Sequence, residues 1–186
     1  MIEFRRYNHD QAREIRDTIM AIFTRSYTDA IASGDPFDSP TAFAERFDAY
    51  TRNPEFDLVV AYLSGHGVGQ AWGWPLTPTT AWWDGLRLDD ETEDHATFTR
   101  EDGTRTFALS EIMVYTEHTG QGYARSLHDE LLRTRNESRA TLLVEPNNER
   151  AYAKYRRWGW TRIGTLTPSW DDAPTLDVLT RPLRVS

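Results

Sequence analysis

The sequence contains no cysteine among its 186 residues. This absence excludes a disulfide framework, a thiolate metal site and a cysteine nucleophile. The chain also lacks the run of about 20 apolar residues that a membrane-spanning helix requires. Its first residues, MIEFRRYNHD, contain neither an apolar stretch nor a small-residue cleavage site. We therefore expect a cytoplasmic protein with no membrane partner.

Several common catalytic and nucleotide-binding motifs are also absent. There is no Gly-x-x-x-x-Gly-Lys loop, no complete Rossmann fingerprint and no serine-centred nucleophile elbow. No histidine lies at metal-ligand spacing from carboxylates, so we expect no metal, and we expect His118 and His128 at the surface. The formal charge of −8 repels phosphate backbones and favours cationic partners, so we expect no nucleic-acid partner.

The length suits one domain, and we interpret residues 1–186 as a single domain. Hydrophobic periodicity predicts the order strand, two helices, three strands, helix, strand, helix and two strands. The expected helices run from Ala12 to a stop at 33–36, from 39–40 to a stop at 53–54, and over 122–137 and 148–158. The expected strands lie at 2–7, 56–63, 68–76, 106–115, 140–144, 160–166 and 175–183. This order predicts a mixed α/β sheet of about seven strands covered by helices.

Two features of the chain each admit two interpretations. The polar segment 77–105 carries an acidic run over 89–94, and it is either a solvated loop or short hairpin, or a flap over an acceptor site. Seven tryptophans are many for this length, and they either form the core or line an aromatic ligand pocket. Trp72 and Trp74 share parity in a predicted strand, so we expect them to face one side.

The most informative segment is residues 110–124, SEIMVYTEHTGQGYA, in which a strand leads through a short loop into a helix. The first N–H groups of a helix lack internal partners and carry the positive end of its dipole, so such a turn binds phosphate or pyrophosphate. Gly120 and Gly122 let the backbone approach a ligand closely. By itself, this pattern also suits a tight turn without a ligand.

A second segment, VEPNN at 144–148, leaves a strand and enters a helix, and Ala151, Tyr155, Gly159 and Trp160 follow in order. Together the two segments resemble the GNAT superfamily of N-acetyltransferases over residues 111–160. The first resembles the acyl-CoA signature Gln/Arg-x-x-Gly-x-Gly/Ala, with Thr119 where the family has Gln or Arg. The second resembles the pattern Asn-x-x-Ala-x-x-x-Tyr-x-x-x-Gly-aromatic. The resemblance implies an α/β (α+β) GNAT-like fold: a mixed, mostly antiparallel sheet with helices on both faces.

The resemblance further implies acetyl-CoA as co-substrate, without a metal, and a primary amine of a small molecule or peptide as acceptor. In the family, the strand before the signature pairs with the pantetheine amides, and the N–H of Val114 would donate to the thioester oxygen. The residues expected to bind the co-substrate are Ile112, Met113, Val114, Thr119, Gly120, Gln121, Gly122, Tyr123, Ala124, Asn148 and Tyr155.

Acetyl transfer requires an acid and a base. Tyr155 lies at the family's general-acid position, although its place also suits a core tyrosine. Glu111 is the first candidate base or an exposed strand carboxylate, and Glu145 is the second candidate. Tyr115 shares parity with Glu111 and would line the acceptor channel. Asn148 suits a helix N-cap as well as a pantetheine contact.

Two other functions fit the same sequence. Thr119 and the unassigned base are compatible with a non-catalytic domain that holds acyl-CoA as a sensor or partner-binding module. A domain that binds another phosphorylated ligand at residues 120–124 is the third reading. The acceptor is expected between the first two helices, the strand of Trp72 and Trp74 and the Trp82–Trp83 loop, where aromatic and acidic residues favour a cationic amine. The chain length of the acyl group stays open, and exposed sheet edges are compatible with a homodimer.

Overall fold

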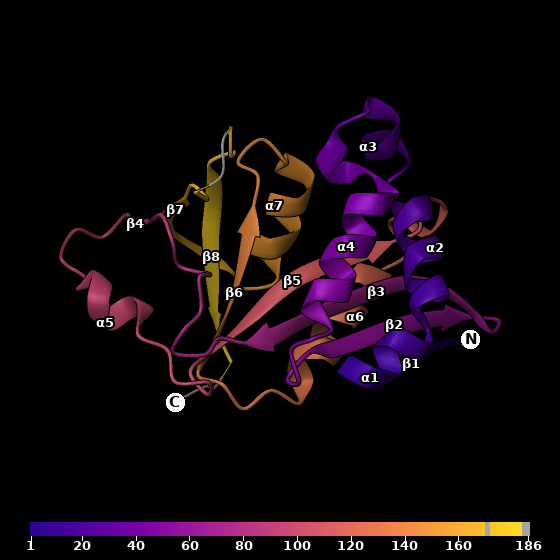
Figure 1. Cartoon of the computed structure of the whole chain (residues 1–186), viewed down its shortest axis with the longest axis horizontal. Coiled ribbons are helices and arrows are strands. Elements are labelled where there is room, and N and C mark those ends of the chain that lie inside the picture. The colour runs from indigo at the N-terminus through magenta and orange to yellow at the C-terminus, as the bar shows by residue number, and fades with distance from the viewer. Residues whose placement is uncertain (170–171, 184–186) are drawn as a thin grey trace. The chain divides into compact units, whose positions relative to one another are not determined.

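The structure is a computed structural model that describes residues 1–169 and 172–183 (Figure 1). Its elements follow the predicted order, with additions. The strands are β1 (Ile2–Asn8), β2 (Asp57–Leu63), β3 (His66–Pro75), β4 (Leu86–Leu88), β5 (Thr106–Val114), β6 (Arg139–Val144), β7 (Thr161–Leu166) and β8 (Leu176–Pro182). The helices are α1 (His9–Glu14), α2 (Arg16–Ser26), α3 (Thr28–Ser33), η1 (Pro36–Asp38), α4 (Pro40–Tyr50), α5 (His95–Thr99), η2 (Thr116–His118), α6 (Tyr123–Arg133) and α7 (Glu149–Arg157).

The strands form an eight-stranded sheet in the order β1-β2-β3-β5-β6-β8-β7-β4. Strands β5 and β6 run parallel, whereas β1–β2, β2–β3, β6–β8, β7–β8 and β4–β7 pair antiparallel. The predicted mixed, mostly antiparallel sheet is therefore confirmed, with one strand more than expected.

The chain divides into two compact units, which we describe separately. The first unit comprises Met1–Trp74 and Ser110–Thr134, and the second comprises Pro75–Leu109 and Arg135–Ser186. Strand β5 passes from the second unit into the first between Leu109 and Ser110.

The single long helix expected after the first strand is wrong, because three helices take its place. Asn8 and Gln11 form the expected capping box at α1. The helical conformation is then interrupted at Ile15 (φ −103°, ψ 21°) and again at Tyr27. Apolar spacing continues through both interruptions, so periodicity alone could not reveal them. Gly34, in the left-handed conformation, ends α3 at the predicted stop.

Trp72 lies in the core of the first unit. Its ring packs against Phe43, Phe47 and Phe56, with centroid distances of 5.6, 5.6 and 5.9 Å, and it is 1% exposed. The core interpretation is therefore confirmed for this tryptophan, and the expectation that it contributes to an acceptor pocket is wrong.

Helices pack on both faces of β3. A Cβ added at Gly67 would meet Thr18 and Ile22 of α2, whereas one added at Gly69 would meet Leu127 of α6. The change of face coincides with a register shift in the β2–β3 pairing, where Tyr62 pairs with Gly67 and Ala61 with Gly69. Helices α2 and α6 therefore enclose this part of the sheet (Figure 1).

The segment 77–105, expected to be a solvated loop or short hairpin, is partly folded into the second unit. It contains β4, which pairs with β7, and the short helix α5. Trp83 and Phe98 are buried and meet edge to face at 5.4 Å. A strand of three residues and a helix of five are too short to show periodicity, which is why both were missed.

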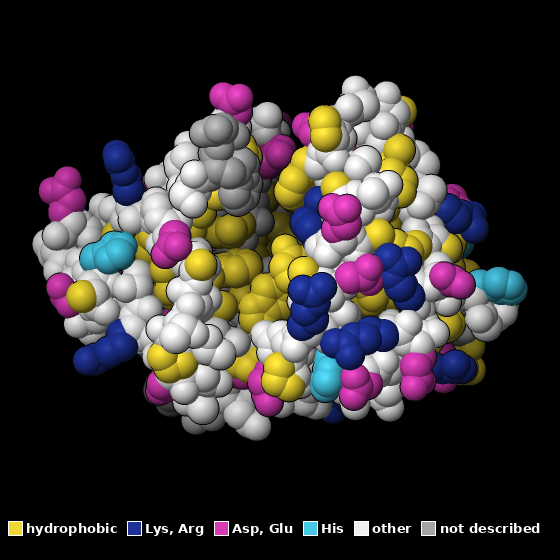
Figure 2. Space-filling model, viewed as in Figure 1, with side chains coloured by type: hydrophobic (Ala, Val, Ile, Leu, Met, Phe, Trp, Pro, Cys, Tyr) yellow, Lys and Arg dark blue, Asp and Glu magenta, His cyan; other side chains and the backbone are white. Residues whose placement is uncertain are grey.

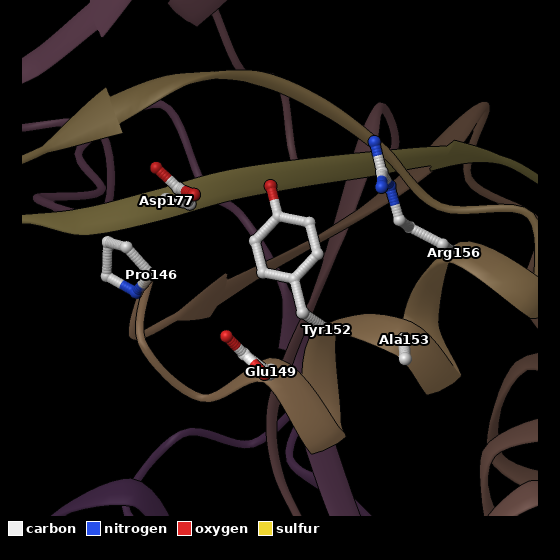
Figure 3. A pocket seen from close by; sticks show the side chains of 6 residues that line it. All are labelled: Pro146, Glu149, Tyr152, Ala153, Arg156 and Asp177. Atoms are coloured by element: carbon white, nitrogen blue, oxygen red, sulfur yellow. The ribbon is translucent and has the colours of Figure 1, made fainter.

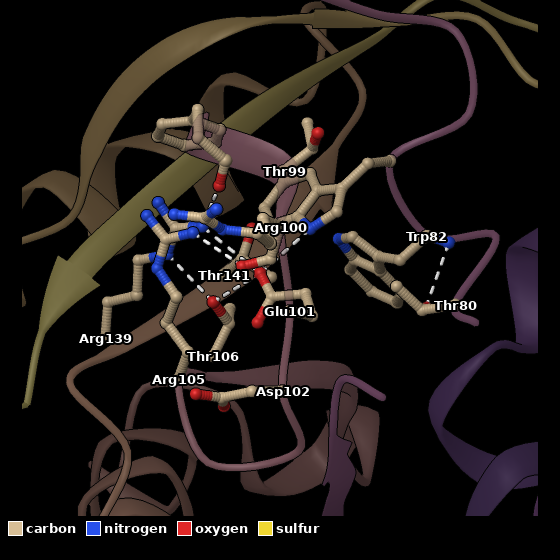
Figure 4. Close-up of polar contacts among 12 residues, drawn as sticks. Thr80, Trp82, Thr99, Arg100, Glu101, Asp102, Arg105, Thr106, Arg139 and Thr141 are labelled. Carbon is tan, nitrogen blue, oxygen red and sulfur yellow. Dashed lines mark hydrogen bonds and ion pairs between the residues drawn. The ribbon is translucent and has the colours of Figure 1, made fainter. Parts of the chain in front are cut away.

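A buried carboxylate secures this segment (Figure 4). One oxygen of Glu101 accepts hydrogen bonds from Trp83 at 3.0 Å and Thr106 at 2.8 Å, and it lies 3.2 Å from the Arg139 guanidinium. The Arg139 guanidinium also lies 4.0 Å from the centroid of the Phe98 ring. Residues of the inserted segment are thereby tied to the first residues of β5 and β6.

Candidate active site

The turn before α6 has the predicted conformation. Gly120 and Gly122 adopt φ values of +88° and +86°, which favour glycine. Gly122 is the N-cap of α6 and makes no side-chain capping bond. A Cβ added at either glycine would meet nothing within 4 Å. The first turn of α6 thus has no side-chain cap and faces open space, and this arrangement fits a pyrophosphate group.

Strand β3 packs closely against the end of β5, which precedes this turn. The N–H of Tyr115 donates to the carbonyl of Val68 at 2.9 Å. A Cβ at Gly69 would lie 3.0 Å from the Met113 carbonyl and 3.1 Å from a Val114 methyl. Only a glycine therefore allows β3 to approach this stretch of β5 so closely.

His128 does not occupy the place that the sequence predicts, whereas the role predicted for Tyr115 in lining an acceptor channel stays a prediction. Tyr115 is buried, with the Arg25 guanidinium 4.1 Å from the centroid of its ring and the His118 ring stacked at 6.1 Å. His128, expected at the surface, is 0% exposed, and its Nδ1 lies 2.7 Å from the Asp129 carboxylate. The prediction for His128 is wrong, because it shares the inward face of α6 with Leu127 and Leu131.

Glu111 lies half-buried on β5 in the first unit. The pKa of its carboxyl group is raised to about 7, and burial is the main cause. The positive charge of Arg46 acts in the opposite direction, and the negative charge of Asp38 adds to the rise. A carboxyl group with a pKa near neutrality is suited to accept and release protons at physiological pH. The alternative reading of Glu111 as an exposed strand carboxylate is wrong, because the residue is half-buried.

Glu111 interacts electrostatically with three further residues, Asp38, Arg46 and Tyr50. The sequence did not identify them as site residues. Tyr50 packs on Trp74, with ring centroids 4.7 Å apart. Burial and the Glu111 charge raise the pKa of the Tyr50 phenol. Arg46 and Tyr50 are four residues apart on α4, and this spacing was the one signal that could have grouped them.

In the second unit, Asn148 caps α7 as expected, because its side chain accepts the N–H of Ala151 at 3.1 Å. Tyr155 is half-buried and makes edge-to-face contacts with Trp158 at 5.7 Å and Trp160 at 6.2 Å. These contacts orient the phenol ring. Glu145 is exposed.

A different face of α7 borders a cavity of about 400 Å³ (Figure 3). Figure 3 shows Tyr152 between Asp177 and Arg156, with Glu149 at the start of the helix. Burial, followed by the neighbouring Asp177 carboxylate, raises the pKa of the Tyr152 phenol. Asp177 is buried and forms an ion pair with Arg162 at 2.9 Å, so its charge is compensated within the unit.

The described part of the chain offers no group of three or more acidic, histidine or cysteine side chains that would hold a metal ion. Within residues 1–169 and 172–183, no helix has the length and apolar character needed to cross a bilayer.

Comparison with known proteins agrees with this geometry. A family model described as the acetyltransferase (GNAT) family matches residues 16–160. No curated protein matches the chain in sequence. Among solved structures, an aminoglycoside 6′-acetyltransferase type Ii is similar at a TM-score of 0.66 and 13% identity, covering 99% of each chain. The ribosomal-protein-S18-alanine N-acetyltransferase from Escherichia coli is similar at a TM-score of 0.64 and 14% identity, covering 100% of this chain and 96% of its own. PaiA N-acetyltransferase from Thermoplasma acidophilum, solved with coenzyme A, is similar at a TM-score of 0.59 and 11% identity, covering 98% and 99%.

Proposed function

Because the chain belongs to the GNAT acetyltransferase family, we propose that it transfers acetyl directly from acetyl-CoA to a primary amine of a small molecule or peptide. Acetyl-CoA supplies the acetyl group as an activated thioester. The amine nitrogen forms a bond to the carbonyl carbon, and the carbon–sulfur bond breaks. The products are an acetamide and CoA thiol, and the proton lost from the ammonium form of the acceptor passes to solvent.

The turn from Thr119 to Ala124 is the proposed site for the pyrophosphate of the co-substrate. Its support is the uncapped N-terminus of α6 behind two glycines with open space beside them. Backbone N–H groups there need no long side chain to hold an anion, so Thr119 in place of Gln or Arg is compatible with binding. The backbone of Ile112–Val114 would pair with the pantetheine arm, and the Val114 N–H would donate to the carbonyl oxygen as negative charge develops on it.

Glu111 is the proposed general base, and its half-buried place on β5 together with its raised pKa supports the assignment. The acceptor amine has a pKa of about 10 in solution and must lose a proton before it attacks. A carboxyl group with a pKa of about 7 is a stronger base than an ordinary glutamate. Glu145 is exposed, whereas Glu111 is half-buried, so Glu111 is preferred.

Tyr155 is the proposed general acid, which gives its phenolic proton to the departing sulfur. The assignment rests on its position in the family pattern, on its partial burial and on the two tryptophans that orient its ring. Asn148 would both cap α7 and contact the pantetheine arm.

The absence of cysteine makes a direct assay possible, because every thiol that appears in solution is CoA. Purified protein is mixed with acetyl-CoA and a panel of primary amines, and thiol release is followed with a thiol reagent. Tyr155→Phe should lower kcat by roughly 10²–10⁴-fold, the range of acid–base catalysis, while CoA affinity measured by calorimetry stays unchanged. CoA binding without turnover on any amine would identify a non-catalytic sensor. Binding of ATP or NAD in place of CoA would identify another phosphorylated ligand.

A further inference from the structure

Among the described residues, Arg46 lacks the carboxylate partner that several other arginines of the first unit have. On the face seen in Figure 2, arginines and carboxylates are interspersed over the helices of this unit. Arg13 pairs with Asp10 at 3.0 Å, Arg16 pairs with Asp48 at 2.8 Å, and Arg25 pairs with Glu117. Arg46 forms no ion pair with any side chain that the structure describes, although it is only half-exposed.

The guanidinium of Arg46 is nevertheless held in one orientation. One of its N–H groups donates to the Phe37 carbonyl at 2.8 Å. Its central carbon lies 4.0 Å from the Phe37 ring centroid and 5.9 Å from that of Phe43. Phe37 is itself 57% exposed, so the ring does little for the core and contacts the arginine instead. A fixed planar guanidinium with unused N–H groups is suited to bind a carboxylate or phosphate through paired hydrogen bonds.

Arg46 interacts electrostatically with the residues of the proposed acceptor site. Its charge acts on Glu111, on Asp38 and on Tyr50, so it belongs to the group of residues around the proposed base. Asp38 and Glu111 are acidic and favour an ammonium group, whereas Arg46 favours an anion. One guanidinium whose charge acts on two carboxyl groups matches a molecule that carries both an amine and a single anionic group.

We propose that Arg46 determines acceptor specificity by binding an anionic group, a carboxylate or a phosphate, on the molecule whose amine is acetylated at Glu111. The inference rests on the proposed function and narrows the acceptor to amino-acid-like compounds. It replaces the expectation of a cationic amine, which depended partly on Trp72, a residue buried in the core.

The test compares matched acceptors in the thiol-release assay. The panel contains ω-amino acids of increasing chain length, the n-alkylamines of equal length, and aminoalkyl phosphates. We expect wild-type protein to favour at least one anionic acceptor over its alkylamine by roughly tenfold or more in kcat/KM, since one charged hydrogen bond contributes about that factor. The preferred chain length reports the spacing of the two groups, and a preference for phosphates over carboxylates identifies the source of the anion.

The variants separate recognition from an effect on the base. Arg46→Met should lower the ratio of kcat/KM for the preferred anionic acceptor to kcat/KM for its alkylamine by roughly 10–100-fold. Because the Arg46 charge also lowers the pKa of Glu111, its loss changes the base for both acceptors alike, and that change leaves the ratio as it was. Arg46→Lys should show a preference for the anionic acceptor between those of the wild type and Arg46→Met, because lysine keeps the positive charge but lacks the planar guanidinium. Arg52→Met is the matched control, because Arg52 is an exposed arginine just beyond α4, and it should change neither acceptor.

Two outcomes would overturn the inference. One is a wild-type protein that uses alkylamines as well as their anionic counterparts. The other is an Arg46→Met protein in which both acceptors lose activity equally, which would make Arg46 a residue that tunes Glu111. If Arg46→Met unfolds below the assay temperature, the inference is tested by the acceptor preference of the wild type and by the change in that preference in Arg46→Lys. Thiol release from no amine at all would instead contradict the proposed function.

Discussion

The ionisation of Glu111 depends strongly on its surroundings. Its carboxyl group has an ordinary pKa near 4.5, and burial raises that value to about 7 in the folded chain. Between these two values the folded state binds more protons than the unfolded state, so the free energy of unfolding falls as pH rises through this window. Above a pH of about 7 Glu111 lowers the free energy of unfolding by its full amount, and below a pH of about 4.5 it does not lower it at all.

We therefore predict that Glu111→Gln stabilises the protein at pH 8 and has little effect at pH 4. The expected gain at pH 8 is on the order of 1–3 kcal/mol, because each pKa unit corresponds to about 1.4 kcal/mol and partial exposure reduces the total. Denaturant unfolding at both pH values measures it, with the exposed Glu14→Gln as control. An equal effect at the two pH values would contradict the raised pKa.

At the scale of single elements, two glycines allow the cost of backbone strain to be measured separately from the loss of ligand binding. Gly34 and Gly122 both adopt the left-handed conformation, and a Cβ at either would meet nothing within 4 Å. Alanine at either position therefore brings the same conformational cost of about 1–2 kcal/mol and no clash. The two positions differ in that only Gly122 lies at the proposed pyrophosphate site.

We predict that Gly34→Ala and Gly122→Ala lower the free energy of unfolding alike, and that only Gly122→Ala weakens CoA binding, by about tenfold or more. The methyl group at residue 122 would occupy the space that the ligand's phosphates require. Calorimetric titration with CoA and denaturant unfolding give the two quantities. Equal CoA affinity in the two variants would exclude this turn as the site.

The inserted segment 77–105 depends on the Glu101 carboxylate. Burial lowers the pKa of the Arg139 guanidinium, which shows that its charge is poorly solvated and needs a partner. We predict that Glu101→Gln lowers the free energy of unfolding by about 3–5 kcal/mol, the usual cost of leaving one buried charge without its partner. In this variant, amide hydrogen exchange should increase in residues 77–105 before it increases in the rest of the second unit.

The control for that prediction is Asp89→Asn, which removes the exposed partner of Arg162 in the same unit. An exposed ion pair contributes about 1 kcal/mol or less, so this variant should remain close to wild type. Similar losses in both variants would show that the Glu101 cluster does not hold the segment.

At the scale of the whole molecule, the sequence predicted what depends on local rules and missed what depends on packing. The strands, the capping residues and the glycine turn follow from short-range conformational preferences, and the family pattern directed attention to Glu111 and Tyr155. Asp38 on η1 and Arg46 and Tyr50 on α4 were missed because both helices are far from β5 in the chain, and no spacing within any of these elements reports its neighbours. Trp72 and His128 were misplaced for the same reason, since parity fixes a face but not what covers it.

The two units alternate along the chain, and this arrangement leads to the last prediction. Residues 1–74 and 110–134 belong to one unit, while 75–109 and the residues after 134 belong to the other. Neither unit is a continuous stretch of chain, and β5 contributes Thr106–Leu109 to the second and Ser110–Val114 to the first. Unfolding either unit therefore removes residues that anchor a strand of the other, so we expect both to unfold in one cooperative transition.

Hydrogen exchange at increasing denaturant concentration, followed by mass spectrometry, tests this expectation. Peptides from β2 in the first unit and β8 in the second should lose protection at the same denaturant concentration, and Glu101→Gln should shift both by the same amount. A shift confined to β8 would show that the units unfold separately. In that case β5 would be a covalent connection that passes through both units without coupling their stabilities.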